Sequence, residues 1–191
     1  QGKHKLEIYD GQHTFLACKR LNKPFDYALY ENVSDRAMID MNNSSKKWCM
    51  EDYLKFGVIN EIEDYVFLNE VYQREKLPLT ALIIIYGGVY ANSQFKKVEW
   101  EAYQRKRGNT IVSHLKEMQR TFNLSQCRYA RFIWGFCKIY KTGLYDHKRM
   151  MEQLNKCSQL MTRQANAGDY AKNIEMVYNY QKAFKNRVKF L

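Results

Sequence analysis

Several kinds of sequence signal are missing from this chain of 191 residues, and each absence excludes a class of protein. The longest strongly apolar run, Leu79–Tyr86, is far too short to span a bilayer. The N-terminus also lacks the charged-then-apolar pattern of a signal peptide. We therefore expect a cytoplasmic protein that has no membrane partner.

Patterned metal ligands and disulfide frameworks are missing as well. The 5 cysteines are odd in number, widely spaced and form no CxxC motif, which excludes a disulfide framework and a zinc ribbon. The 4 histidines are scattered and form no HExxH motif. We therefore expect no metal site, and most cysteines are expected to be small buried apolar residues.

What the chain does contain is positive charge, and this charge is concentrated in the C-terminal half. Residues 1–90 hold 11 Lys and Arg against 13 Asp and Glu, a net charge of −2, whereas residues 91–191 hold 20 against 7, a net charge of +13. Such a basic half is typical of a protein that binds a polyanion, because each cation set against a phosphate releases a counterion. The alternative is a solvated helical surface that is cationic without a ligand.

Helical periodicity extends over most of the second part of the chain. Apolar residues at helical spacing predict helices over Glu61–Lys76, ended by Pro78, and over Leu79–Tyr86, ended by two glycines. Further helices are expected over 125–141, 147–163 and 170–188. These segments predict an all-helical C-terminal domain.

The basic residues of this helical part are the candidates for contact with DNA. A cluster at a predicted turn, Arg105–Gly108, is followed by single cations on two helical segments. The candidate DNA-binding residues are Arg105, Lys106, Arg107, Arg120, Arg128, Arg131, Lys138 and Lys141. Four neighbouring aromatic residues could stack on bases or could form core, namely Tyr129, Phe132, Trp134 and Phe136.

The DGQH stretch near the N-terminus is the most informative short motif. Lys5–Tyr9 predicts a short strand, and the residues that follow predict a helix ending near Asn22, with Phe15, Leu16, Cys18 and Leu21 on its buried face. A glycine in a strand–turn–helix lets the backbone approach a ligand and directs helix N–H groups at an anion. The alternative is an ordinary turn without a ligand.

Within this turn, Asp10 and His13 form the one titratable pair beside the expected phosphate site. His13 could act as an acid and base or could bind phosphate when charged. In the other interpretation Asp10 caps the helix and His13 packs inside the fold.

The residues after the turn extend this pattern to residue 57. Phe25–Tyr30 predicts a second strand, Ser34 caps a short helix, and an Asn-rich turn leads to a helix over Met50–Phe56. In the order of these parts the run DGQHTFLACKRLNKPFDYALYENVSDRAMIDMNNSSKKWCMEDYLKFG resembles the DGQHR branch of the ParB/sulfiredoxin-like superfamily, in a form associated with phages and mobile elements.

The resemblance implies an α+β fold with two domains. Residues 1–57 would form a ParB-like α/β module and residues 58–191 the basic helical domain. Only 9 residues precede Asp10, where the family has a strand and a helix, so we expect the module to be truncated or divergent at its N-terminus.

The resemblance also implies that the DGQH turn handles nucleotides or phosphate, with a nucleoside triphosphate as the cofactor to test. The residues implied in binding are Gly11, Gln12, His13, Thr14, Asn42, Asn43 and Lys46. Thr14 stands where the family has arginine, which replaces a forked charged contact by one neutral hydrogen bond.

Three functions follow from these observations. The first is a DNA-associated protein in which the helical half binds DNA and the DGQH turn binds a nucleotide or phosphate. The second is a phosphotransferase or nuclease that uses Asp10 and His13 as catalytic residues. The third, favoured by the loss of the family arginine, is a degenerate domain that serves protein contacts. A homodimer is compatible with each of them.

Overall fold

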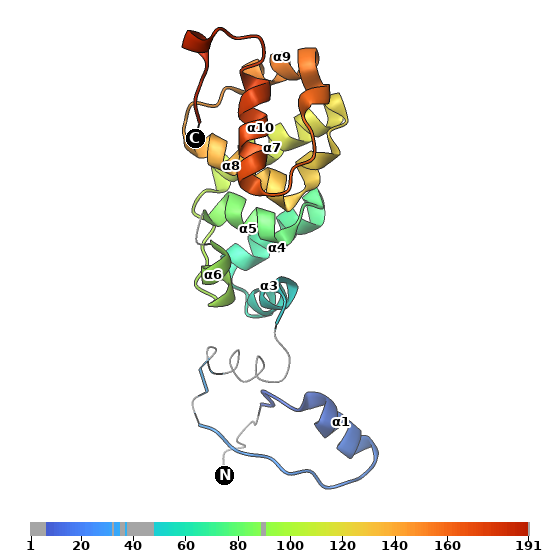
Figure 1. Ribbon diagram of the computed structural model, residues 1–191. Coiled ribbons are helices and arrows are strands. Elements are labelled where there is room, and N and C mark those ends of the chain that lie inside the picture. The colour runs from blue at the N-terminus through green and yellow to red at the C-terminus, as the bar shows by residue number, and fades with distance from the viewer. Residues whose placement is uncertain (1–6, 32, 35–36, 38–47, 89–90, 191) are drawn as a thin grey trace. The chain divides into compact units, whose positions relative to one another are not determined.

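The chain divides into two compact units, residues 1–49 and residues 50–191. The computed structural model describes residues 7–31, 33–34, 37, 48–88 and 91–190 (Figure 1). Every regular element in these residues is a helix, and no strand forms among them. The expected α+β fold is therefore wrong.

The segment Phe25–Tyr30 shows why the alternating pattern does not produce a strand. Its side chains are exposed on both sides, with 70% of Tyr27 and 67% of Leu29 accessible. A strand needs a neighbour to bind its N–H and C=O groups and a surface to cover its apolar face, and neither is present in the described part of the unit.

The first unit contains helix α1, Gln12–Arg20, at the position expected from the sequence. The predicted buried face is wrong, because α1 has no buried residue and Leu16 and Leu21 are 49% and 69% exposed. Lys19 and Arg20 occupy the last turn, where positive charge suits the helix dipole. The short helix expected after Ser34 lies largely outside the described residues.

The second unit begins with four helices, three of which pack around the apolar fourth. They are α3 (Met50–Ile59), α4 (Glu63–Glu75), α5 (Leu79–Gly87) and α6 (Ala91–Lys96). Helix α3 packs against α4, α5 and α6, which places it in this unit, whereas the sequence predicts a domain boundary after residue 57.

Helix α5 is the centre of the second unit because it is apolar on nearly every side. It contacts α3, α4 and α6 on one side and α7 and α8 on the other. Pro78 is its N-cap and Gly88, with φ +84°, its C-cap, so the predicted helix boundaries are confirmed.

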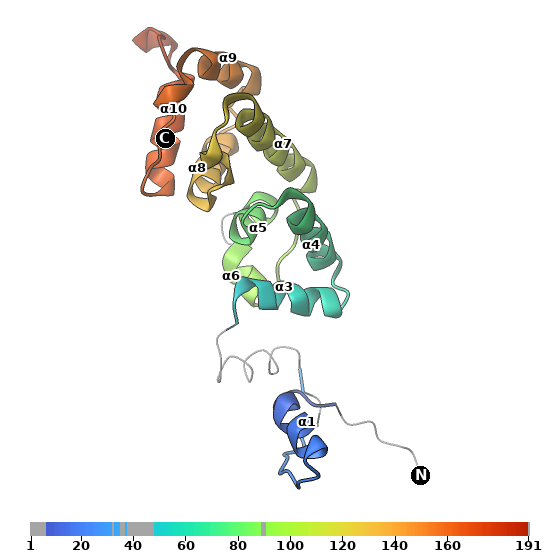
Figure 2. The same ribbon diagram turned by 90° about the vertical axis from the view of Figure 1, so that its right-hand side faces the viewer.

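A second group of helices completes the unit (Figure 2). It contains α7 (Arg105–Phe122), a 3₁₀ turn at Ser125–Arg128, α8 (Ala130–Lys141), α9 (His147–Cys157) and α10 (Ala167–Tyr178). Helix α10 packs closely on α8, because a Cβ atom at Gly135 would lie 2.7 Å from the carbonyl oxygen of Ala167.

Four sequence-based boundaries in this group are wrong, one of them at the end of α9, which lies at Cys157 and not at residue 163. The turn predicted at Arg105–Gly108 is the first turn of α7, and Gly108 is buried against the ring of Tyr86. The helix predicted over 125–141 is interrupted at Tyr129, which has extended backbone. The last predicted helix ends ten residues early, at Tyr178 rather than Val188.

The early end of α10 has a local cause. The Asn179 side chain donates to the carbonyl oxygen of Val188 at 2.7 Å and accepts from its N–H at 2.9 Å. This pair folds residues 180–188 back onto the helix, and Phe190 is then buried against Tyr178 at 5.0 Å between ring centroids. Within the described residues no helix combines the length and the apolar character needed to cross a bilayer.

Candidate nucleic-acid interface

The DGQH turn forms the start of α1. Gly11 is the N-cap and has φ +74°, a conformation that favours glycine. The carboxylate of Asp10 accepts from the Gly11 N–H at 2.7 Å, and the Gln12 amide donates to the Ile8 carbonyl at 3.0 Å. Among the described residues no side chain caps the first turn of α1.

The two candidate catalytic residues, Asp10 and His13, are both exposed. In the part of the unit that the structure describes, no hydrogen bond joins them. Thr14 is also exposed, one position further along α1. The remaining candidates for phosphate binding, Asn42, Asn43 and Lys46, lie outside the described residues.

Arg105 connects α7 to α4 rather than facing a free surface. Its guanidinium donates to Asp64 at 2.7 Å and to Glu63 at 3.0 Å, and it lies 4.5 Å from the ring centroid of Phe67. The hydrogen bond to Asp64 is the main reason that the pKa of Arg105 is raised. Two of the five N–H donors of this predicted DNA contact, both on one terminal nitrogen, are therefore used inside the protein.

Two other candidates also have partners within the fold. Arg107 donates to the Gln104 side chain at 3.0 Å and lies 5.5 Å from the ring centroid of Tyr140. Arg131 donates to the carbonyl oxygen of Ala165 at 2.8 Å while its side chain stays exposed.

The five remaining candidates are exposed, and no ion pair to them occurs among the described residues. They are Lys106, Arg120, Arg128, Lys138 and Lys141. Arg131 and Lys138 are seven residues apart on α8, which is two helical turns, so they share its solvent face. Lys141 follows one turn later, and α8 therefore presents a cationic face opposite its apolar one.

The four aromatic candidates for base stacking differ in burial, because two lie in the core and two are partly exposed. Phe132 and Phe136 are fully buried and belong to the core. Tyr129 is 40% exposed and carries the guanidinium of Arg163 at 5.6 Å from its ring centroid. Trp134 is half-buried on α8. Tyr129 and Trp134 are thus the two of these four aromatic side chains that keep part of their surface exposed.

A polar groove of about 720 Å³ lies between α4 and α7 and was not expected from the sequence. Ion pairs join the two helices in the same order, Arg105 with Glu63 and Asp64, then Lys116 with Glu75, so the helices run parallel. The residues that line the groove are Arg74, Glu75, Asn109, Val112, Ser113, Lys116, Glu117, Gln119, Arg120 and Asn123.

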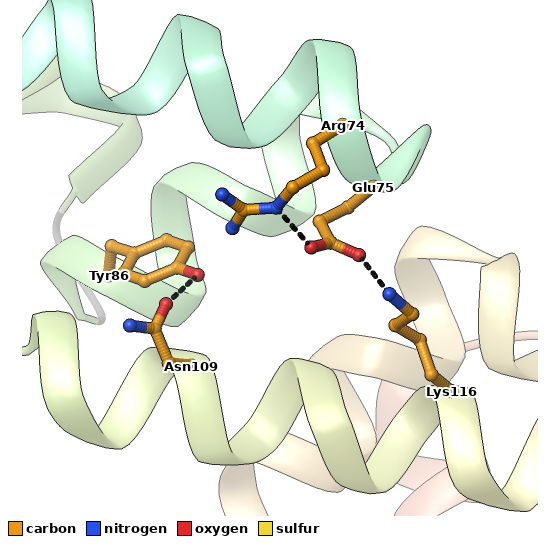
Figure 3. A network of polar contacts seen from close by, with 5 residues as sticks. All are labelled: Arg74, Glu75, Tyr86, Asn109 and Lys116. Carbon is orange, nitrogen blue, oxygen red and sulfur yellow. Dashed lines mark hydrogen bonds and ion pairs between the residues drawn. The ribbon is translucent and has the colours of Figure 1, made fainter.

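Glu75 is the charged group that organises one wall of this groove (Figure 3). Its side chain is only 6% exposed and accepts from Arg74 at 2.7 Å and from Lys116 at 2.9 Å. Burial raises the pKa of the Glu75 carboxyl, but the two hydrogen bonds prevail and its pKa lies below the usual range. Glu75 is therefore charged at neutral pH and holds both cations in place.

A second contact in Figure 3 orients a neutral donor. The buried Tyr86 hydroxyl donates to the Asn109 side-chain oxygen at 2.8 Å. Because this bond occupies the amide oxygen, the amide nitrogen of Asn109 is the end left to bind a ligand.

Next to the groove, α7 and α9 meet in a pair of stacked histidines. The rings of His114 and His147 are 3.7 Å apart and nearly parallel. His147 contacts Glu117 at 3.0 Å through Nε2 and the Tyr145 hydroxyl at 2.8 Å through Nδ1. Burial, and then the neighbouring His147, lower the pKa of His114 to about 4. The sequence gives no signal for this pair because the histidines are far apart in the chain.

No family model, curated protein or solved structure matches the chain.

Proposed function

We propose that residues 50–191 bind DNA through the basic helices α7 and α8. The observation that carries this proposal is the surplus of cations in residues 91–191, 20 Lys and Arg against 7 Asp and Glu. Arg120, Arg128, Lys138 and Lys141 are exposed and form no ion pair among the described residues. Free cations of this kind release counterions when they meet phosphates.

The proposed contact is with the phosphate backbone, because long cationic side chains outnumber groups that could read base edges. Tyr129 and Trp134 add two aromatic faces that a base from a single strand could stack on. The protein should therefore bind many DNA sequences with similar affinity.

The test is a fluorescence anisotropy titration of the full chain with labelled double-stranded and single-stranded DNA across a salt series. We expect log affinity to fall linearly with log salt concentration, with a steep negative slope. An absence of DNA binding at low salt would refute the proposal.

The DGQH turn is proposed to bind the phosphate of a nucleotide. Support comes from the uncapped N–H groups of α1 and from the positive φ of Gly11, which lets a ligand approach the backbone. Titration of a nucleoside triphosphate into the wild type and into Asp10→Ala and His13→Ala variants tests this. Equal nucleotide affinity in all three proteins would remove the turn as the site.

Protein contacts through residues 1–49 form a second candidate function, favoured by their exposed apolar side chains. Tyr27, Leu29 and Tyr30 are each at least 66% exposed, and α1 buries no residue. Exposed apolar groups in this number are typical of a surface that a partner covers, and a second copy of the chain is the simplest partner. Light scattering across a concentration series would detect the dimer, and a monomer at every concentration would argue against it.

A further inference from the structure

The groove between α4 and α7 is rich in hydrogen-bond donors. Arg74 contacts Glu75 through its Nε atom, and neither terminal nitrogen of its guanidinium has a hydrogen-bond partner among the described residues. Within the described part of the chain the Lys116 ammonium contacts Glu75 alone, and the Lys116 side chain is 60% exposed. Asn109 and Ser113 add an amide N–H and a hydroxyl from successive turns of α7.

The two carboxylates of the groove, in contrast, already bind other side chains of the protein. Glu75 is bound by two cations, and Glu117 contacts His147. The other acceptor oxygens of the lining belong to neutral groups, the amides of Asn109, Gln119 and Asn123 and the hydroxyl of Ser113. A ligand that fits this lining must supply acceptors of its own, preferably charged ones.

Arg120 decides the sign of the groove's charge. Three cations and two carboxylates line it, a net charge of +1, and Arg120 is the cation that has no carboxylate partner among the described residues. Helix α4 ends at Glu75, and its C-terminal carbonyl groups carry partial negative charge that opposes an anion. Without Arg120 the groove would be neutral by formal count and negative once the helix end is included.

The positions of Arg74 and Lys116 are fixed before a ligand binds. Both side chains are bonded to the same buried carboxylate, so less side-chain entropy is lost when they contact an anion. Figure 3 shows the two side chains approaching Glu75 from opposite helices, which places a cation on each wall of the groove.

We propose that this groove binds a phosphate group, with Arg74, Lys116 and Arg120 as its charged contacts and Asn109 and Ser113 as neutral donors. The phosphate can belong to the backbone of DNA or to a free nucleotide. In the first case the proposal rests on the DNA-binding function proposed above, and in the second case it does not.

Pyrophosphate is the probe for the groove, and the full chain labelled with ¹⁵N is titrated with it and followed by NMR. We expect the amide signals of Ser113, Lys116 and Arg120 to shift with saturation. Arg120→Gln should lower the affinity for pyrophosphate about tenfold, because it removes one charge-assisted hydrogen bond. Lys55→Gln, an exposed position on α3 outside the groove, removes the same charge and should leave the affinity unchanged.

A second arm identifies the source of the phosphate. The same variants are titrated with labelled DNA and with a nucleoside triphosphate. Weaker DNA binding by Arg120→Gln than by Lys55→Gln supports a backbone phosphate, and a loss confined to the triphosphate supports a nucleotide.

The outcomes separate the two proposals. If pyrophosphate shifts none of the groove signals and Arg120→Gln behaves like Lys55→Gln with every ligand, the groove proposal is overturned while DNA binding can still stand. If the wild type binds no DNA but pyrophosphate shifts the groove signals, DNA binding fails and the groove remains supported.

Discussion

Residues 50–90 and residues 91–191 pack into one unit but carry opposite charge. The first region holds 3 Lys and Arg against 7 Asp and Glu, a net charge of −4, and the second has a net charge of +13. Carboxylates of the acidic region bind cations of the basic region, as Glu63 and Asp64 do with Arg105. Ion pairs between the two regions therefore help to hold them together. The cations of the basic region that form no such pair remain available to a polyanion.

The contact between the two regions can be broken at Gly108. A side chain there would collide with the ring of Tyr86, which is fully buried in α5 and cannot move aside. We expect Gly108→Val to lower the free energy of unfolding by about 3 kcal/mol, measured by urea denaturation.

The matched control is Thr110→Val, which places the same β-branched residue at an exposed position of α7. Its effect should stay within about 0.5 kcal/mol. Equal unfolding midpoints for the two variants would mean that α5 and α7 do not pack as described.

The charge difference can be reduced without touching the core. Replacing Arg128, Lys138 and Lys141 by Gln should weaken the salt dependence of DNA binding. The slope of log affinity against log salt concentration should become less negative by roughly 3. The free energy of unfolding should barely change, because all three side chains are exposed. Lys55→Gln in the acidic region should leave the slope as it is, and a triple variant with the wild-type slope would exclude these residues from the interface.

The ion pairs between the regions can be weakened at Glu75. We expect Glu75→Gln to cost about 1.5 kcal/mol of unfolding free energy, because a buried carboxylate and two charge-assisted hydrogen bonds are lost while Arg74 and Lys116 stay hydrated. Since the pKa of Glu75 is lowered by folding, its contribution is present above the unfolded pKa of about 4.3 and is lost as the pH falls below it.

Urea denaturation of the wild type and of Glu75→Gln at neutral and acidic pH measures the pH-dependent contribution of Glu75 to the free energy of unfolding. The difference between the two proteins should shrink as the pH falls through the range where the carboxylate is protonated. A difference that stays constant with pH would assign the effect to packing and not to charge.

The smallest expected effect is the acid sensitivity caused by His114. Its pKa is about 4 in the folded state against about 6.5 when unfolded, so the unfolded state binds more protons between these values. Stability is therefore complete above about pH 6.5 and is lost as the pH falls toward 4, by up to about 1 kcal/mol after allowance for solvent.

His114→Phe keeps a ring on His147 and removes the titration. Its unfolding free energy should change less than that of the wild type between about pH 7 and about pH 5. His147 and Glu117, which face His114, are present in both proteins and serve as the internal control. Parallel pH profiles would show that His114 does not titrate in this range.

Prediction from the sequence succeeded where local signals were strong. Pro78 and Gly88 bound α5 as expected, because proline cannot continue a preceding helix and glycine adopts the positive φ of a C-cap. It failed at Gly108, where a glycine beside three basic residues indicated a turn. In the fold that glycine is the close contact between α7 and Tyr86, a requirement set by a residue in another helix.

The candidate site was likewise predicted from the sequence only in part. The basic character of residues 91–191 was visible in the sequence, and so was the list of cations. The list could not distinguish Arg105, bound to two carboxylates, from Arg120, which faces the groove. It also missed Arg74 and Lys116, because their shared partner Glu75 makes them a site only when α4 and α7 lie side by side.

The sequence by itself determined the charge of each region and the ends of the helices that carry their own stop signals, since both depend on residue type and on neighbours within one or two turns. The tertiary structure decided that Phe25–Tyr30 forms no strand and which cations are left for a ligand. These outcomes depend on partners distant in the sequence, whose hydrogen bonds and buried surfaces form only when the chain is folded.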